Sequence, residues 1–184
     1  MKTQTIEIRR RVAASSDKLF GAWTGAEALR QWMCGPDTDV ARVQVDARSG
    51  GTLSLDLRAL AGGEIFEHVG RYSAVERPAR LAFTWTSEAT GGAETIVTVS
   101  LEKHGACTEL ALTHAGLPSE AAARYHAAAW TAMIERLAVR GESASSAKVA
   151  RSRQNKERDR RRIVEIRRGS SDAGLARTGR FRAE

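Results

Sequence analysis

The spacing of hydrophobic residues near the N-terminus changes from every second position to every third or fourth. Apolar and charged side chains alternate over residues 6–12, as in a strand with one buried face. Apolar residues then recur every three to four positions in 15–23 and again in 29–33, which predicts two short helices. Ser15 or Ser16 is placed to cap the first of them.

Period-two alternation returns in the middle of the chain. Glycine pairs at 50–51, 62–63 and 91–92 separate the alternating stretches, and such pairs are typical of hairpin turns. Hairpin connections between successive strands give an antiparallel sheet. Six further strands are therefore expected, at 42–46, 53–58, 65–75, 81–86, 97–101 and 110–112.

The stretch 117–141 has the period of a long amphipathic helix. Pro118 and Ser119 supply a stop and an N-cap, and the basic last turn before Gly141 predicts that the helix ends at this glycine. Alanines fill much of the helix and occupy little volume beside its large residues. The large residues that share one face are Tyr125, His126, Trp130, Met133, Ile134 and Leu137.

Together these elements predict an α+β fold. A sheet with one apolar face needs a cover on that side, and only the long helix is able to provide it. We expect a curved antiparallel sheet of about seven strands wrapped around the C-terminal helix, with two short helices after strand 1. Such a sheet leaves volume at the helix ends, where ligand pockets are commonly found.

The charges divide the chain into two parts. Residues 1–141 hold 16 basic and 16 acidic side chains, whereas residues 142–184 hold 13 basic and 6 acidic ones and carry the whole formal net charge of +7. We therefore expect a globular domain over 1–141 and a basic Arg-rich tail over 142–184. The tail has too few apolar residues to offset its ordering entropy, so we expect it to be disordered or transiently helical.

Two interpretations of the tail stay open. It is either a solvated appendage without a specific role, or a basic segment whose 148–168 run contacts nucleic-acid phosphates non-specifically and with strong salt dependence. Its abrupt change of composition is also what a shifted reading frame would produce.

The two cysteines and the N-terminus bear on location. Cys34 and Cys107 lie far apart and form no Cys-x-x-Cys motif, which argues against a zinc or redox site. No apolar stretch approaches the roughly 20 residues of a membrane span, and the N-terminus carries no export signal. We therefore expect a cytoplasmic protein with reduced thiols.

Several short motifs in residues 5–140 resemble the START-like (Bet v 1-like, SRPBCC) superfamily, in order and with similar spacing. Within it, the sequence is most similar to the small bacterial proteins grouped with the C-terminal domain of the activator of heat-shock protein 90 ATPase. The motifs are Phe20-Gly21-Ala22-Trp23-Thr24, Arg30-Gln31-Trp32, Gly35-Pro36, Gly50-Gly51, Gly70-Arg71-Tyr72, Arg80-Leu81-Ala82-Phe83-Thr84-Trp85, Leu112-Thr113-His114 and His126 with Trp130.

This resemblance implies a helix-grip fold with a largely apolar internal cavity. Members of the superfamily include carriers of lipids and other hydrophobic ligands, cyclase-like enzymes and co-chaperone domains, so the fold alone does not choose a function. The chain departs from the family at Trp32-Met33, where two tryptophans are common, and at Ala129, where a glycine is common. Both changes bear on the shape of the cavity.

If the strand alternation sets the inward face as expected, residues of the sheet and helix line this cavity. Tryptophans at a cavity rim offer apolar area and one N–H donor, whereas most aliphatic residues on this face are expected to be core. The candidate ligand-binding residues are Trp23, Trp32, Met33, Leu55, Phe66, His68, Tyr72, Phe83, Trp85, Val97, His126, Trp130 and Met133.

His68, Tyr72 and His126 are the polar members of this set. A buried imidazole or phenol needs a hydrogen-bond partner, and the simplest interpretation is a structural bond within the protein. The alternative is general acid–base catalysis in an apolar cavity. Adding His114 produces no typical metal-ligand spacing, so neither a metal site nor a cofactor is expected, and no residue is assigned as catalytic.

Three functions remain as hypotheses. The first is a cytoplasmic domain, not an enzyme, that binds a small hydrophobic or amphipathic ligand between sheet and helix. The second is a co-chaperone-like module of the stress response whose partner is another protein. The third is a cyclase- or hydrolase-type enzyme using the same cavity, and for all three we expect a monomer or a homodimer.

Overall fold

The structure is a computed structural model that describes residues 3–172 of the 184-residue chain; beyond residue 141, side chains are described only at 151 and 154–158. The elements in chain order are β1 (Gln4–Val12), α1 (Ser16–Thr24), α2 (Ala26–Leu29), β2 (Thr38–Val45), β3 (Thr52–Ala59), β4 (Ile65–Glu76), β5 (Arg80–Ser87), the 3-10 turn η1 (Glu88–Thr90), β6 (Thr95–His104), β7 (Cys107–Leu117) and α3 (Glu120–Asp172).

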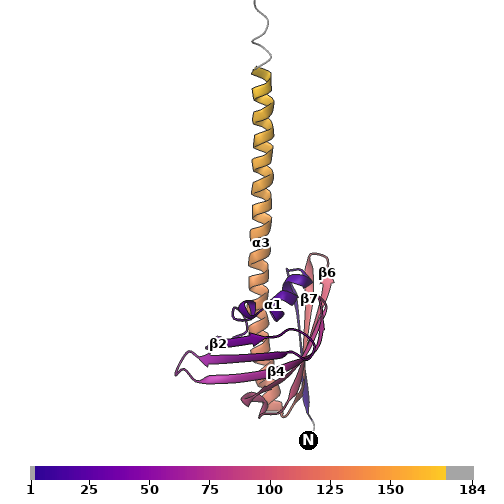
Figure 1. Ribbon diagram of the computed structural model, residues 1–184, viewed down its shortest axis with the longest axis vertical. Coiled ribbons are helices and arrows are strands. Elements are labelled where there is room, and N and C mark those ends of the chain that lie inside the picture. The colour runs from indigo at the N-terminus through magenta and orange to yellow at the C-terminus, as the bar shows by residue number, and fades with distance from the viewer. Residues whose placement is uncertain (1–2, 173–184) are drawn as a thin grey trace, which may run out of the picture. The chain divides into compact units, whose positions relative to one another are not determined.

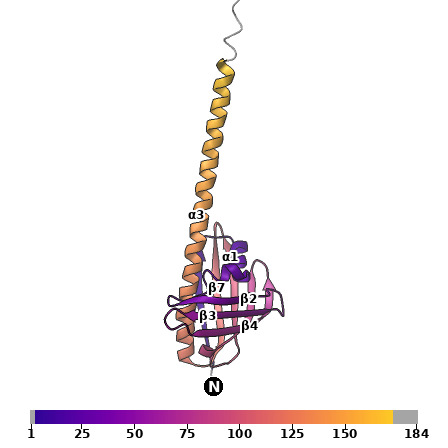
Figure 2. The same cartoon turned by 60° about the vertical axis from the view of Figure 1, so that its left-hand side comes forward.

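All seven strands form one antiparallel sheet in the order β1-β7-β6-β5-β4-β3-β2. The expected strand number and pairing are therefore confirmed. Figures 1 and 2 show a strongly bent sheet, in which β2, β3 and β4 run across the first turns of α3 while β6 and β7 run alongside them. The helix-grip fold predicted from the sequence is the observed one.

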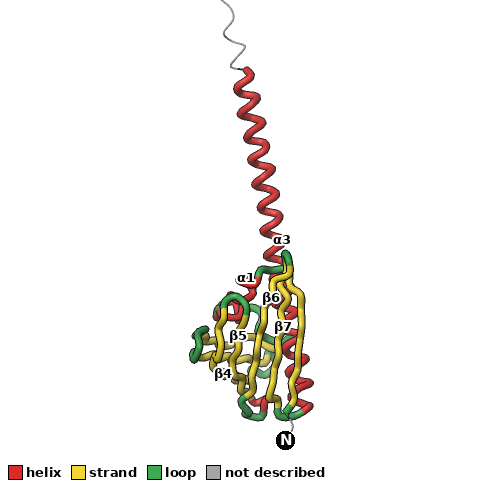
Figure 3. Tube along the Cα trace, turned by 90° about the vertical axis from the view of Figure 1, so that its right-hand side faces the viewer, coloured by secondary structure: helices red, strands yellow, loops and turns green. Residues whose placement is uncertain are grey.

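The alternation of apolar and polar residues sets the two faces of the sheet, as expected. Phe66 is half-buried on the inner face, and Val69 and Ile96 lie exposed on the outer one. Figure 3 views the sheet from outside, with the first turns of α3 behind the strands. The buried inner residues are Leu53, Leu55, Leu57, His68, Tyr72, Leu81, Phe83, Trp85, Val97, Val99, Leu101, Leu110 and Leu112.

The first turns of α3 cover this face as the sequence predicts. Ser119 caps the helix, because its Oγ accepts a hydrogen bond of 3.1 Å from the backbone N–H of Ala122. Trp130, Ile134 and Leu137 lie one turn apart and are buried against the sheet.

Gly141 does not end α3, so the helix end predicted there is wrong. A glycine that ends a helix takes a left-handed conformation, and Gly141 is not among the residues with positive φ. A Cβ at this position would lie 3.0 Å from Val12 Cγ1 and 3.5 Å from Ala14 Cβ. The glycine is therefore explained by the close approach of α3 to the end of β1.

The second short helix is also shorter than predicted. Ser15 caps α1 as expected, but α2 ends at Leu29, and Trp32 and Met33 follow it in irregular backbone. Both side chains are nevertheless buried, and Trp32 Nε1 donates to the Ala22 carbonyl oxygen at 3.1 Å. Burial of the indole, rather than helix geometry, places this segment.

The chain divides into two compact units, Met1–Ser143 and Ala144–Glu184. In the second unit the described residues, 144–172, are helical, and the last part of the predicted tail, 173–184, lies outside the described residues. The expected division of roles between domain and tail stays a prediction. None of the helices within 3–172 contains an apolar stretch of the length that crossing a membrane requires.

Candidate ligand-binding groove

Most of the predicted ligand-binding residues lie in the packed core. Only Phe66, His68 and Met133 border an open pocket on the described surface that we take as the candidate site. The predicted residues that pack in the core are Trp23, Trp32, Met33, Leu55, Tyr72, Phe83, Trp85, Val97, His126 and Trp130.

The four tryptophans occupy the centre of the hollow between sheet and helix. The ring centroid of Trp23 lies 4.6 Å from that of Trp32 and 6.0 Å from that of Trp130, and Trp85 lies 5.4 Å from Trp130. Aromatic pairs at such distances stabilise a core beyond the area that they bury. The space for a ligand is therefore found beside this cluster rather than within it.

The candidate pocket lies between α3 and the segment that follows α2, and its volume is about 370 Å³. On the helix side it is bordered by Ala128, Ala129 and Ala132, whose small side chains leave the space open. We call it the apolar lobe. Its lining residues are Gly35, Pro36, Asp37, Thr38, Leu57, Phe66, His68, Tyr125, Ala128, Ala129, Ala132 and Met133.

The opposite wall of the apolar lobe is a short loop, 35–38. Thr38 Oγ1 accepts a hydrogen bond of 2.8 Å from the backbone N–H of Gly35, which closes the loop on itself. This bond holds Pro36 and Asp37 at the pocket edge. A second hollow of about 320 Å³ shares Phe66, His68 and Tyr125 with the apolar lobe and is otherwise lined by Glu64, Glu67, Ser87, Glu88 and Ala89.

His68 is the buried polar group at the junction of the two hollows. Only 7% of the residue is exposed, and its Nδ1 lies 3.0 Å from the carbonyl oxygen of Phe66, to which it donates. Burial lowers the pKa of His68, against the opposing effect of backbone groups at Leu55 and Phe66. The imidazole is therefore neutral at pH 7, with Nε2 as a hydrogen-bond acceptor.

Trp85 packs against His68 with ring centroids 4.8 Å apart. Its Nε1 is buried and has no hydrogen-bond partner among the described residues. Buried donors are normally paired, so a water or a ligand group at this point would satisfy it.

His126 and Tyr72, the other polar candidates, are turned to the interior. His126 Nδ1 donates to the carbonyl oxygen of Ala122 at 2.8 Å, and burial lowers the pKa of the imidazole. Burial favours the neutral form of Tyr72 as well, and there it raises the pKa to about 12, so the phenol stays neutral. The His126 bond is a structural one, as the simpler interpretation of the sequence has it.

His114 belongs to a chain of buried hydrogen bonds. Trp130 Nε1 donates to His114 Nδ1 at 3.1 Å, so the imidazole proton is on Nε2, which donates to Thr95 Oγ1 at 2.7 Å. Thr95 in turn donates to the carbonyl oxygen of Trp85 at 2.6 Å. Every polar atom of this chain is paired, so His114 joins helix and sheet. Within residues 3–172, no group of three or more His, Cys, Asp or Glu side chains is placed to hold a metal ion.

Sequence reasoning missed most of the pocket lining. The loop 35–38 has no hydrophobic period, and Tyr125, although on the predicted helix face, is 59% exposed at the pocket edge. The alanines were a usable signal, because a run of small residues on the inner face of a helix leaves volume beside it. Which of the alanines border the pocket depends on the path of the loop.

A family model described as Activator of Hsp90 ATPase homolog 1-like protein matches residues 13–142. Among curated proteins, no relative matches the chain.

Solved structures agree on the fold. A protein from Chromobacterium violaceum is 23% identical, with a TM-score of 0.69 over 76% of this chain and 98% of that chain. An AHSA1 protein from Silicibacter pomeroyi is 23% identical, with a TM-score of 0.67 over 74% of this chain and 96% of that chain. An HSP90 activator from Plasmodium falciparum is 24% identical, with a TM-score of 0.50 over 63% and 75% of the two chains. The family match and the shared helix-grip fold together show that the chain belongs to the Activator of Hsp90 ATPase homolog 1-like family of the Bet v 1-like superfamily.

Proposed function

We propose that the protein binds a small hydrophobic or amphipathic molecule in the apolar lobe. The observation that carries this proposal is an open pocket of about 370 Å³ between α3, the loop 35–38 and the edge of the sheet at Leu57 and Phe66, lined mainly by apolar side chains. Small-molecule sites typically measure roughly 300–1,000 Å³ and combine apolar walls with a few polar groups. His68 is such a group, because its neutral imidazole accepts a hydrogen bond from a hydroxyl or amide of the ligand.

Among the predicted ligand-binding residues, Phe66, His68 and Met133 belong to the proposed contact surface. The remaining predicted residues act on the ligand only indirectly, by holding α3 at its distance from the sheet. Trp85 is the nearest of these, because its ring packs on His68.

Filling the pocket tests the proposal. Ala132→Phe places a ring in the apolar lobe and is expected to weaken binding of octan-1-ol at least tenfold, measured by isothermal titration calorimetry on the full-length protein. Ala121→Phe is the matched control, because Ala121 lies in the first turn of the same helix, exposed and outside the pocket lining. The proposal fails if the wild-type protein does not bind octan-1-ol, or if the two variants bind it equally.

A co-chaperone-like module is the second candidate. The family description and the similarity to an HSP90 activator from Plasmodium falciparum favour it, at the level of the fold. Under this proposal the partner is a protein of the stress response, and the added chain should stimulate the ATPase activity of Hsp90. If a saturating concentration of this protein leaves the ATPase activity of Hsp90 unchanged, the co-chaperone proposal is wrong.

For the basic run 148–168 we propose non-specific contact with nucleic acid. Arg151, Lys156 and Arg158 support it, since all three are exposed on α3. We also propose a cytoplasmic location, which the free thiols of Cys34 and Cys107 support.

A further inference from the structure

The side of α3 that borders the apolar lobe continues for two more turns. Ala132 and Met133 are followed at helical spacing by Arg136 and then by Arg140, so all four lie along one stripe of the helix. The stripe changes from small and apolar to basic within one turn. One turn of an α-helix rises about 5.4 Å, which is within the reach of one small molecule.

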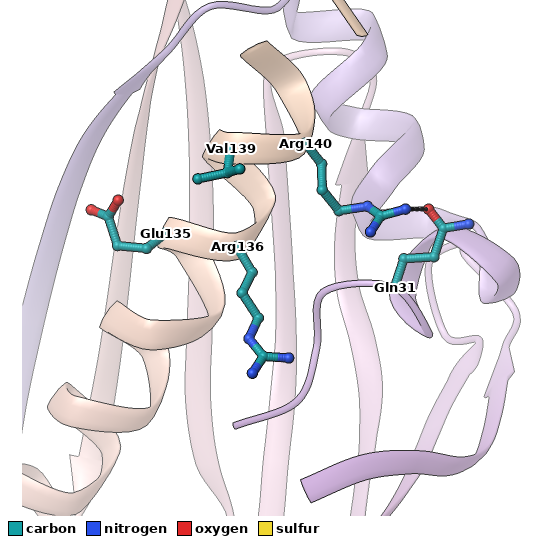
Figure 4. Close-up of a pocket in the computed structure, with 5 residues that line it drawn as sticks. All are labelled: Gln31, Glu135, Arg136, Val139 and Arg140. Atoms are coloured by element: carbon teal, nitrogen blue, oxygen red, sulfur yellow. Dashed lines mark hydrogen bonds between the residues drawn. The ribbon is translucent and has the colours of Figure 1, made fainter. Parts of the chain in front are cut away.

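A second pocket, of about 420 Å³, lies along the basic part of this stripe. Figure 4 shows its lining residues, Gln31, Glu135, Arg136, Val139 and Arg140. We call it the basic lobe. Its far wall, at Gln31, belongs to the same segment after α2 that supplies residues 35–38 to the apolar lobe.

Arg136 connects the two lobes. Its guanidinium donates to the Sγ of Cys34 at 3.0 Å, and Cys34 directly precedes Gly35 of the apolar lobe. The basic and apolar lobes have no lining residue in common, but both lie between α3 and the segment 31–38, and we call the two together the groove.

The partners of the two arginines of the basic lobe are not carboxylates. Arg140 donates to the side-chain oxygen of Gln31 at 2.6 Å, and Arg136 to the Cys34 thiol. Among the described residues, no carboxylate forms an ion pair with either arginine. By contrast Arg124, on the same helix, pairs with Glu120 at 2.8 Å.

Glu135 is the carboxylate that borders the basic lobe, and it is engaged elsewhere. It pairs with Arg10 at 3.0 Å, and in Figure 4 its side chain points away from Arg136 and Arg140. The two guanidinium groups are thus available to an anion, which they would bind with charge-assisted hydrogen bonds.

The other end of the groove has the opposite charge. Asp37 borders the apolar lobe, and Glu64, Glu67 and Glu88 border the hollow beside it. An anionic group would be repelled there and attracted at Arg136 and Arg140. The charges therefore fix one orientation for an amphipathic anion.

We propose that the ligand is an amphipathic anion, of which a medium-chain carboxylate is the simplest example. Its carboxylate lies at Arg136 and Arg140, and its alkyl chain extends beside Ala132 and Met133 into the apolar lobe. This inference rests on the proposed function, because it names the chemical class of the molecule bound there.

The test compares octanoate with octan-1-ol, which have the same chain length, on the full-length protein by calorimetry. Arg136→Met keeps an apolar stem about as long as the aliphatic part of the arginine side chain and removes the charged guanidinium group. It is expected to weaken octanoate binding about tenfold or more and to change octan-1-ol binding less than about twofold. Arg124→Met is the matched control and should leave both affinities unchanged. Both variants keep the basic tail, so comparing them removes any contribution of the tail to octanoate binding.

Two results separate this inference from the proposed function. Equal loss of both probes in Arg136→Met, or no difference between Arg136→Met and Arg124→Met for octanoate, overturns the anion site while hydrophobic binding stands. If the wild-type protein binds octan-1-ol but not octanoate, only the anion site is overturned. If it binds neither probe, both proposals are overturned.

Discussion

His114 uses both ring nitrogens within one buried chain of hydrogen bonds, between Trp130 on α3 and Thr95 on β6. Burial lowers its pKa to about 3, with a smaller contribution from the nearby His126. His68 and His126 are shifted in the same direction, again mainly by burial. The folded domain therefore holds three imidazoles that resist protonation.

The sign of the resulting pH dependence follows from these shifts. Above about pH 6.5 the imidazoles are neutral in both states, and their contribution to stability is complete. As the pH falls below 6.5, the unfolded chain binds protons that the folded chain refuses, and for His114 this continues to about pH 3. The free energy of unfolding should therefore decrease, by up to about 1.4 kcal/mol per pH unit through His114 alone, and His68 and His126 contribute in the same direction.

Urea unfolding of the His114→Gln variant between pH 7.5 and pH 4 measures how much His114 contributes to this pH dependence of stability. The variant should lose less stability with falling pH than the wild type. Parallel slopes for wild type and His114→Gln would contradict the assignment.

At the scale of single residues, the sequence predicted burial but did not predict which residues border a pocket. Strand alternation placed Leu55, Phe83 and Val97 on the inner face, where they are buried. The same alternation does not distinguish a residue that packs on another side chain from one that borders empty space. That distinction depends on the distance of α3 from the sheet, which four packed tryptophans set.

At the scale of elements, α3 illustrates what local signals determine. Its start is fixed by a local hydrogen bond to the Ser119 side chain and was predicted correctly. Its continuation past Gly141 was not predicted, because the glycine lies in a close approach to Val12, which is distant in sequence. A glycine needed for close packing and a glycine that ends a helix are identical in a single sequence.

Removing the cap tests the role of this helix start. Ser119→Ala should lower the free energy of unfolding by about 1 kcal/mol, because the N–H of Ala122 loses its acceptor. Thr131→Ala is the control: its hydroxyl donates to the Ala127 carbonyl oxygen on an exposed part of the same helix, and stability should change by less than about 0.5 kcal/mol. Equal losses in urea unfolding would show that the cap contributes nothing specific.

At the scale of the whole molecule, charge and core are segregated. The net charge of +7 belongs to residues 142–184, and the buried side chains described here belong to the preceding domain. The division of roles between domain and tail is a prediction from composition. Composition does not reveal a partner for the tail, since basic residues attract any polyanion.

Deleting residues 144–184 is expected to remove DNA binding but leave the stability of the domain almost unchanged. The free energy of unfolding of the domain should change by less than about 0.5 kcal/mol, since this segment adds no described residue to the core. Retention on a DNA column at low salt should be lost. Retention by the shortened chain, or loss of its cooperative unfolding, would contradict this division.

The methionines allow the most direct test of ligand binding in the groove. The chain has three: Met133 borders the apolar lobe, Met33 is fully buried in the core, and Met1 begins the sequence. Full-length protein labelled with ¹³C at the methionine methyl groups is titrated with octan-1-ol and followed by NMR. We expect the Met133 resonance to shift to saturation while that of Met33 stays in place. A Met133 resonance that does not move, or a shift of Met33 in its stead, would contradict binding in this groove.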